Sequence, residues 1–225
     1  MSRQTSTIRR PTALLKAPAS VVAGSGRLPR WKRAMDVVIS VMALVVLAPV
    51  MALIALAVRV DSKGPALFRQ ERLGFNGRPF ECWKFRSMCQ DAEALRASLE
   101  AQNEADGHIF KMKDDPRRTR VGKVLRKTSL DELPQLWNVL RGDMSLVGPR
   151  PPLPSEVEKY LPEEWARLQG IPGMTGLWQV RARHRKDFQE MVRLDVEYLG
   201  DIRFRKDVAI LLLTIPAVLI GRGAQ

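Results

Sequence analysis

Two adjacent carboxylates, Asp131 and Glu132, form the most concentrated chemical signal in this chain of 225 residues. They follow a strongly basic segment, residues 117–127, and precede an arginine, Arg150, in a proline-rich loop. A helix N-terminus combined with arginine and lysine side chains is a phosphate-binding site. A carboxylate beside such a site can hold a divalent metal or attack phosphorus as a nucleophile. The surrounding cations favour the ionised form of Asp131, which a nucleophile requires.

A purely structural interpretation of the same residues stays open. Ser129 and Glu132 have the spacing of a capping box, in which each side chain bonds the backbone of the other residue. Asp131 in the first turn would favour the helix dipole without any function. Pro134 is tolerated only close to a helix start, so both carboxylates are expected there. The basic segment could equally be a solvated face of the protein.

The elements that position these residues follow from periodicity and turn residues. Two extended runs between Ala66 and Met88 flank Asn76-Gly77, which predicts a β-hairpin. Apolar residues recur at helical spacing from Leu130 to Leu140, and Gly142 is a stop signal. A stiff loop is expected over residues 148–154. Further helices are expected over residues 91–104, 156–169, 187–199 and 207–220.

An uncharged apolar run of 22 residues, Val37–Val58, has basic residues on both sides and a proline, Pro49, inside it. A helix of that length measures about 33 Å, enough to cross a hydrocarbon core of about 30 Å. Basic residues mark the cytoplasmic side of a membrane segment, so two basic flanks favour a helix that enters and returns. Pro49 supplies the break because it has no backbone N–H to donate. An ordinary single span with a tolerated proline is the alternative.

The formal net charge is +13, but much of the excess lies in the N-terminal tail. Residues 1–33 hold eight Lys/Arg and no acid, leaving 37 − 8 = 29 basic and 24 acidic residues in the remainder. Such a tail favours an anionic membrane surface. Nucleic-acid binding is disfavoured because no stacking aromatic residue lies within residues 117–127. Cys82 and Cys89 match no metal or redox spacing.

Three segments together resemble the monotopic bacterial phosphoglycosyl transferases. These segments are PALFRQERLGFNGRPFECWKFRSM, DPRRTRVGKVLRKTSLDELPQLWNVLRGDMSLVGPRPPLP and GIPGMTGLWQV, and they follow the proline-containing apolar run. The resemblance extends from about Trp31 to the C-terminus and is greatest to the short members involved in exopolysaccharide production. Motifs in this order are far more specific than one short motif.

The resemblance implies roles for individual residues. By position, Asp131 matches the nucleophile and a Mg²⁺ ligand, and Glu132 matches the second acid of the catalytic pair. Pro49 matches the proline that breaks a re-entrant helix. The expected binders of substrate phosphates are Arg126, Arg150, Lys84 and Arg117.

The implied reaction transfers a hexose-1-phosphate, with galactose or glucose expected, from a UDP-sugar to polyprenyl (undecaprenyl) phosphate. It proceeds by a ping-pong mechanism through an aspartyl phosphosugar, and UMP is released. An N-acetylhexosamine donor and a non-catalytic basic membrane scaffold are the alternatives, and a homo-oligomer is left open. The expected location is the cytoplasmic face of the bacterial inner membrane.

We therefore predict a mainly helical α+β fold in three parts. Residues 1–30 form a basic, disordered tail, and residues 31–60 form the re-entrant membrane helix broken at Pro49. Residues 61–225 form a cytoplasmic sugar-phosphate transferase domain with a small β-hairpin and interfacial helices.

Overall fold

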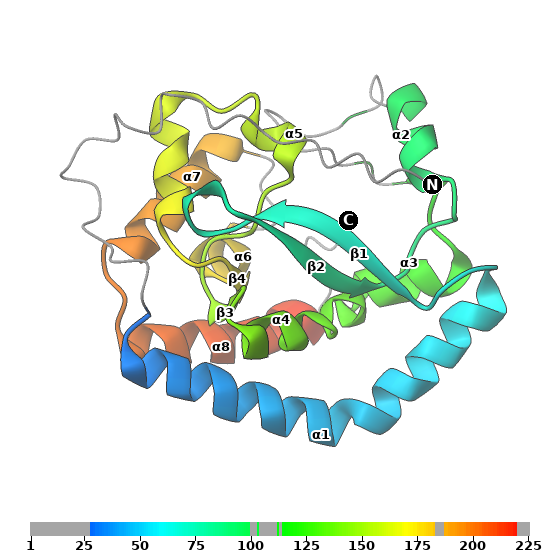
Figure 1. Ribbon diagram of the computed structural model, residues 1–225, viewed down its shortest axis with the longest axis horizontal. Coiled ribbons are helices and arrows are strands. Elements are labelled where there is room, and N and C mark those ends of the chain that lie inside the picture. The colour runs from blue at the N-terminus through cyan, green and yellow to red at the C-terminus, as the bar shows by residue number, and fades with distance from the viewer. Residues whose placement is uncertain (1–27, 100–102, 104–111, 113, 183–186, 220–225) are drawn as a thin grey trace.

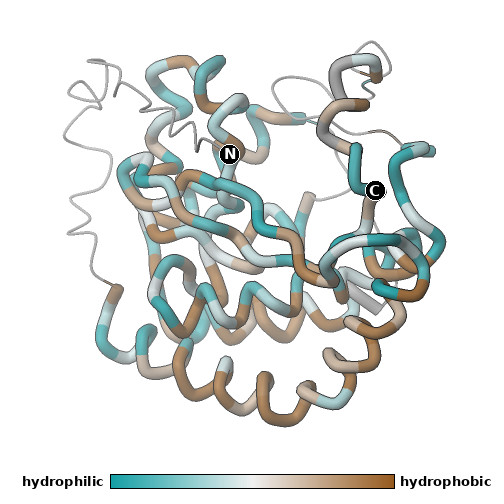
Figure 2. Tube along the Cα trace, turned by 45° about the vertical axis from the view of Figure 1, so that its right-hand side comes forward, coloured by the Kyte–Doolittle hydropathy of each residue, from teal (hydrophilic) through white to brown (hydrophobic). Residues whose placement is uncertain are grey.

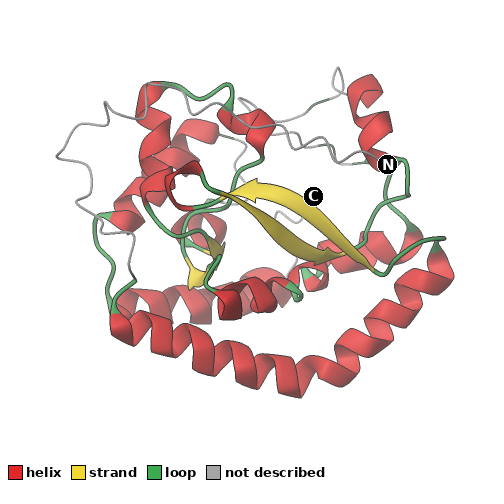
Figure 3. Cartoon of the chain, viewed as in Figure 1, coloured by secondary structure: helices red, strands yellow, loops and turns green. Residues whose placement is uncertain are grey.

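The computed structural model describes residues 28–99, 103, 112, 114–182 and 187–219. The described part is mainly helical with little sheet, as predicted (Figure 3). One long helix, α1 (Arg30–Asp61), runs along the lower edge of the molecule in Figure 1. The β-hairpin and the shorter helices all lie above it. The tail predicted for residues 1–30 falls almost entirely outside the described residues.

The predicted hairpin is confirmed. Strand β1 (Leu67–Leu73) pairs antiparallel with β2 (Pro79–Phe85), so that Leu67 faces Phe85 and Leu73 faces Pro79. A 3-10 turn, η2 (Phe75–Gly77), connects them. Asn76 and Gly77 both have positive φ, at 53° and 69°, which is the conformation that asparagine and glycine tolerate. The two turn residues therefore fix which side chains of the hairpin face the protein interior.

A second, parallel pair of strands was not predicted. Strand β3 (Ser145–Val147) pairs with β4 (Gly173–Thr175), with Ser145 opposite Gly173. Just beyond β3, the N–H of Gly148 donates to the carbonyl of Thr175, and the N–H of Gly173 donates to the carbonyl of Pro149. A Cβ on Gly173 would lie 2.0 Å from the backbone N of Gly148, so only glycine allows this approach. The pairing anchors the loop that carries Arg150.

Several predicted helices are confirmed. Helix α2 (Ala92–Leu99) lies within the predicted range. Helix α3 (Arg120–Lys127) was not predicted; its N-cap is Thr119, whose hydroxyl accepts from the Gly122 N–H. Helix α4 (Gln135–Arg141) ends at Gly142, with φ of 87°. Helix α7 (Phe188–Leu199) is capped by Asp187. The remaining short helix is α6 (Leu177–Arg181).

Two predictions about helices are wrong. Residues 130–140 do not form one helix, because a 3-10 turn, η4 (Leu130–Glu132), precedes α4, and Pro134 has no N–H to continue a helix through it. Residues 156–169 divide into α5 (Pro154–Val157) and the 3-10 helix η5 (Pro162–Gln169). Leu161 is extended, with ψ of 157°, as expected for the residue before a proline.

The main hydrophobic core lies between the hairpin and the helices behind it. It combines Leu73 and Cys82 of the hairpin with Val139 of α4 and Met191 and Tyr198 of α7. A smaller cluster joins Ile54 and Val58 of α1 to Phe85 of β2 and Leu125 of α3. Because this second cluster uses the C-terminal end of α1, the long helix packs on the domain at that end.

Helix α1 is continuous and has not been broken at Pro49, which corrects the prediction of an interrupted helix. It runs through Pro49 to Asp61 and is visibly curved (Figure 1). A proline removes only one backbone hydrogen bond, so the turns on either side persist. The helix is long and apolar enough to cross a membrane by length and composition alone, and its apolar character is evident in Figure 2. Its exposed large apolar residues are Val38, Val41, Met42, Val45, Val46, Val50, Leu53, Leu56 and Val60.

The N-terminal end of α1 is attached by buried polar contacts. The Lys32 ammonium donates to Asp207 at 2.5 Å, and both side chains are almost fully buried. Asp207 belongs to α8 (Phe204–Leu219) and also accepts from the Tyr198 hydroxyl. Asp36 accepts from the Ser145 hydroxyl and the Leu146 N–H at the start of β3. These contacts connect α1 to α7, α8 and β3.

The C-terminal end of α1 is attached to the same domain. The guanidinium of Arg86, just after β2, donates to the carbonyls of Ser62 and Lys63. The Asp61 carboxylate accepts from the Val121 N–H in α3 at 2.9 Å. Both ends of the apolar helix are therefore held by one folded unit.

The Lys32–Asp207 ion pair should be essential for stability. Replacing Lys32 with Met leaves the Asp207 charge buried without its ammonium partner, so we expect a loss of about 3–5 kcal/mol in the free energy of unfolding. Denaturant unfolding of the protein in detergent measures it. The matched control is Arg203→Gln, which removes an ion pair to Asp201 from a side chain that is 76% exposed; its effect should stay within about 1 kcal/mol. Equal losses in both variants would contradict the assignment.

Candidate active site

A cavity of about 420 Å³ is lined by both predicted catalytic carboxylates, Asp131 and Glu132. The same cavity is lined by the basic residues Arg72, Lys84, Arg126 and Arg150. Hydroxyl and amide side chains complete its polar surface, namely Thr128, Ser129, Gln135, Thr175, Gln179 and Thr214. A concave site with convergent charges of both signs suits a small polyanionic substrate.

Separate elements bring the charges together. Lys84 comes from β2, Arg126 from the last turn of α3, and the two carboxylates from η4. The turn into η4 depends on Ser129, whose φ of 55° lies in the left-handed region. Arg150 comes from the loop after β3 that the Gly148–Gly173 approach holds against β4. The site is therefore assembled from three separate parts of the chain, namely strand β2, the adjoining α3 and η4, and the loop after β3.

Asp131 is a buried carboxylate with an altered acidity. Burial raises the pKa of Asp131 to about 6. The positive charges of Lys84 and Arg126 oppose that rise, and the negative charge of Glu132 adds to it. Asp131 makes no ion pair with any residue that the structure describes, although cations lie close by. It is thus ionised at neutral pH and more basic than an ordinary aspartate, which suits a nucleophile.

Glu132 has a different environment from its neighbour. Its carboxylate accepts from the Lys84 ammonium at 2.8 Å. The capping-box interpretation is wrong, because the Ser129 side chain makes no capping hydrogen bond. Glu132 instead crosses from η4 to the hairpin and fixes Lys84 beside Asp131.

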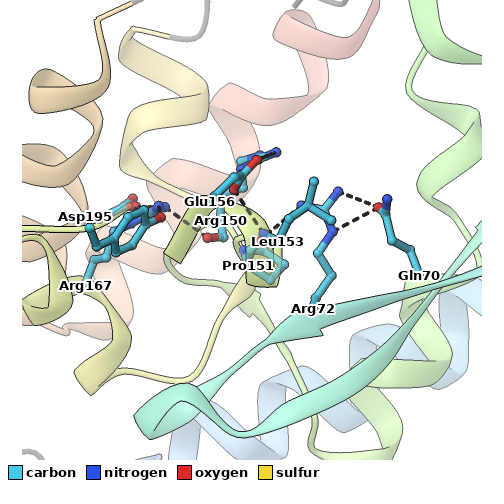
Figure 4. A network of polar contacts seen from close by, with 9 residues as sticks. Gln70, Arg72, Arg150, Pro151, Leu153, Glu156, Arg167 and Asp195 are labelled. Carbon is cyan, nitrogen blue, oxygen red and sulfur yellow. Dashed lines mark hydrogen bonds and ion pairs between the residues drawn. The ribbon is translucent and has the colours of Figure 1, made fainter. Parts of the chain in front are cut away.

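Arg150 is part of a buried charge network (Figure 4). Its guanidinium donates to both carboxylate oxygens of Glu156, at 3.1 and 3.4 Å. Burial opposes the charged form, but the Glu156 carboxylate outweighs it and raises the pKa of Arg150. The carbonyl of Arg150 accepts from Arg167, which in turn forms a buried ion pair with Asp195 at 2.6 Å. Both the side chain and the backbone of Arg150 are thereby held in place.

The two remaining predicted cations lie in different settings. Arg126 lines the cavity, where burial lowers its pKa and Asp131 acts in the opposite direction. Arg117 does not line the cavity. Its guanidinium bonds both oxygens of Asp115, at 2.9 and 2.7 Å, and both residues are buried. The contacts of Arg117 therefore support the fold around α2 and α3. Because Arg117 does not line the cavity, nothing in the cavity favours its predicted role in substrate binding.

Arg72 lines the cavity and was not selected from the sequence. Its guanidinium donates to the side-chain oxygen of Gln70 and to the carbonyl of Pro151 (Figure 4). Burial, with a smaller contribution from Arg150, lowers the pKa of Arg72 to about 10. In the sequence, Arg72 is one of several charged residues in RQER. Only the hairpin register would have indicated which of them faces inward.

Mg²⁺ commonly binds proteins through one or two carboxylates together with substrate phosphates. Over the residues described, no three His, Cys, Asp or Glu side chains gather as a preformed metal cluster. Asp131 with substrate oxygens fits this mode of binding. Glu132 is less suited to it because the Lys84 ammonium already bonds one of its oxygens.

Residues 28–221 match the family described as bacterial sugar transferase. The chain belongs to this family. This sugar transferase is 47% identical over 195 residues to the galactosyl transferase CpsE of Streptococcus agalactiae, covering 86% of this chain and 43% of the relative. It is 44% identical over 200 residues to the undecaprenyl-phosphate galactose phosphotransferase of Salmonella typhimurium, covering 86% of this chain and 41% of the relative.

A third relative has a similar length. The exopolysaccharide production protein ExoY of Sinorhizobium fredii is 40% identical over 197 residues, which cover 86% of this sugar transferase and 87% of ExoY. The chain thus spans less than half the length of the first two relatives and most of the third.

The raised pKa of Asp131 predicts a cost in stability. Because Asp131 binds a proton more tightly in the folded protein than in the unfolded chain, its own contribution to stability should become less favourable as the pH rises from about 4 to above 6. Asp131→Asn removes that cost and should stabilise the protein by about 1–3 kcal/mol at pH 7.5, with less gain at low pH. Unfolding in metal-free detergent buffer at both pH values measures it. Asp201→Asn, at a half-exposed site, is the control. Destabilisation by Asp131→Asn at pH 7.5 would show that the ionised carboxylate supports the fold.

Proposed function

We propose that this sugar transferase moves a hexose-1-phosphate from a UDP-sugar to polyprenyl phosphate, with Asp131 as its nucleophile. The observation that carries the proposal is a buried carboxylate, Asp131, lining a cavity with four basic side chains. Similarity to the undecaprenyl-phosphate galactose phosphotransferase of Salmonella supports transfer of a hexose phosphate to a lipid carrier.

The charges in the cavity suggest a role for each residue in the two reaction steps. In the first step an Asp131 oxygen bonds the sugar-bearing phosphorus, and the bond from that phosphorus to the UMP oxygen breaks. Lys84 and Arg126 lie beside Asp131, where they would stabilise charge on the transferred phosphoryl group. In the second step an oxygen of polyprenyl phosphate attacks the same phosphorus, and the Asp131 carboxylate is released.

The neighbouring acid has a supporting role in this proposal. Because Glu132 bonds Lys84 at 2.8 Å, its charge is already stabilised and its oxygen is a weaker nucleophile. It positions the lysine and repels the Asp131 charge. A bound Mg²⁺, held by Asp131 and substrate oxygens, would supply neutralisation of the diphosphate charge.

We also propose that α1 lies within one leaflet and that the domain faces the cytoplasm. A straight helix of 32 residues is about 48 Å long, so a perpendicular placement would separate its ends across the bilayer. Contacts of Lys32 at one end and Asp61 at the other go to the same folded unit. The basic N-terminal tail further favours the cytoplasmic side.

Asp131→Asn should abolish turnover, because the amide cannot form the phosphosugar bond. Enzyme mixed with UDP-sugar and no lipid acceptor should gain a phosphosugar on Asp131, detected by mass spectrometry of its peptides. Glu132→Gln should lower the rate but still allow the adduct. An adduct on another residue, or one that persists in Asp131→Asn, would refute the mechanism. A panel of UDP-sugars in the same assay identifies the hexose.

A re-entrant α1 predicts that both of its flanks are cytoplasmic. Cysteines placed before Trp31 and after Asp61, in a background lacking Cys82 and Cys89, should react only with reagents that reach the cytoplasm. Pro49→Leu should favour a straight helix, move the tail towards the periplasm and reduce activity. Periplasmic labelling before Trp31 in the otherwise unchanged protein would refute placement in one leaflet.

A further inference from the structure

The cavity contains two groups of cations, and only one of them lies next to Asp131. The charges that act most strongly on Asp131 are those of Lys84, Glu132 and Arg126. Those that act most strongly on Arg72 are Arg150 and Glu156. Arg72 and Arg150 are also joined through the loop, because Arg72 donates to the carbonyl of Pro151 at 2.8 Å. The two guanidinium groups therefore form a second basic centre in the same cavity.

This second centre has more positive charge than its protein partners neutralise. Glu156 bonds Arg150, whereas the partners of Arg72 are a carboxamide oxygen and a backbone carbonyl, both neutral. No carboxylate pairs with Arg72 anywhere in the described ranges. Arg72 is only 8% exposed. A buried, uncompensated guanidinium is costly, so its retention at a cavity wall indicates an anionic ligand.

The orientation of Arg72 is fixed before any ligand arrives. Its Nε and one Nη donate to Gln70 at 3.1 and 2.7 Å, and its other Nη donates to Pro151. A guanidinium carries five N–H groups, so these three bonds leave donors for a ligand. Figure 4 shows Arg72 and Arg150 on adjacent parts of one network. Such preorganised donors suit phosphate oxygens.

The proposed reaction gives this centre a specific task. In an in-line displacement, the attacking and leaving oxygens lie on opposite sides of phosphorus. When UMP leaves, its phosphate is on the side opposite Asp131. When Asp131 leaves in the second step, the polyprenyl phosphate must occupy that same side. Both are phosphate monoesters.

We propose that Arg72 and Arg150 form one phosphate-monoester subsite, occupied first by the departing UMP phosphate and then by the attacking polyprenyl phosphate. This inference rests on the proposed function. In the first step the phosphorus–oxygen bond breaks and its electron pair stays on the UMP phosphate held by the two arginines. In the second step a polyprenyl phosphate oxygen supplies the electron pair for the new bond, and the pair of the breaking bond returns to Asp131.

The wild-type enzyme tests the sharing of the subsite through product inhibition. With one shared subsite, UMP binds the phosphosugar enzyme in place of the acceptor and should inhibit competitively against polyprenyl phosphate. Against UDP-sugar, its inhibition should be noncompetitive. Competition against UDP-sugar instead would indicate separate sites and overturn the inference. That result would leave the aspartyl adduct, and hence the proposed function, intact.

Variants of Arg72 test where the subsite lies. In Arg72→Gln, the KM for UMP in UMP–UDP-sugar isotope exchange and the KM for polyprenyl phosphate should both rise about tenfold or more. Arg72→Lys keeps the charge but loses the fork and should have an intermediate effect; it also serves if Arg72→Gln does not fold. The control is Arg69→Gln on the same strand, where the side chain is 59% exposed, and both constants should be unchanged.

Other results in these variants would overturn the inference. A rise in only one of the two KM values would mean that UMP and polyprenyl phosphate use different sites. A lower turnover rate with both constants unchanged would mean that Arg72 only supports the loop at Pro151. In either case, detection of the phosphosugar on Asp131 in the wild-type enzyme would still support the proposed function.

Discussion

The carboxylate of Asp131 is buried, and a buried charge is tolerated only where other charges and hydrogen bonds surround it. Lys84 and Arg126 provide the positive charge near Asp131, and both cations are themselves partly buried. Lys84 is held by Glu132, and Arg150 across the cavity is held by Glu156. Cations therefore lie around the buried carboxylate of Asp131, and one of them, Lys84, is paired with a further carboxylate, as Arg150 is paired with Glu156 in another part of the cavity. Hairpin, 3-10 turn and proline loop must all be in place for this arrangement to exist.

Helix α1 is also attached through buried charges that have polar partners. The helix exposes a row of apolar side chains away from the domain, and buried polar contacts at both ends fix it to that domain. Hydrophobic contacts alone would permit the helix to slide or rotate, whereas the Lys32–Asp207 and Asp36–Ser145 contacts specify one register. Strand β3 donates to Asp36 of α1 and also leads to the loop that carries Arg150. The long apolar helix and the cavity are therefore connected through β3.

Some local features were predictable from the sequence, whereas strand register and strand pairing were not. Asn76-Gly77 specifies its own turn, and Gly142 its own helix end, since each depends on backbone preferences of one or two residues. The family motifs placed Asp131, Glu132 and Arg126 in one site. Arg72 was missed because the choice between faces of a charged strand depends on register. The β3–β4 pair was missed because three-residue strands carry little pattern and their pairing joins glycines far apart in sequence. Arg117 was placed with the substrate binders, but the nearby acid Asp115 binds it.

The two adjacent acids, Asp131 and Glu132, differ in a way that matters for the proposed two-step reaction. A nucleophilic carboxylate must be basic enough to attack phosphorus and yet stable enough as an anion to leave again. Burial makes Asp131 more basic, and Lys84 and Arg126 limit that increase, so that its pKa is about 6 and it is ionised at neutral pH. Glu132 is less suited to this role, because the Lys84 ammonium already stabilises its negative charge and makes its oxygens weaker nucleophiles. The same ion pair joins the hairpin to η4 and keeps the lysine close enough to act on the Asp131 charge. In the proposed mechanism, Asp131 carries out the displacement, and Glu132 positions the lysine that acts on its charge.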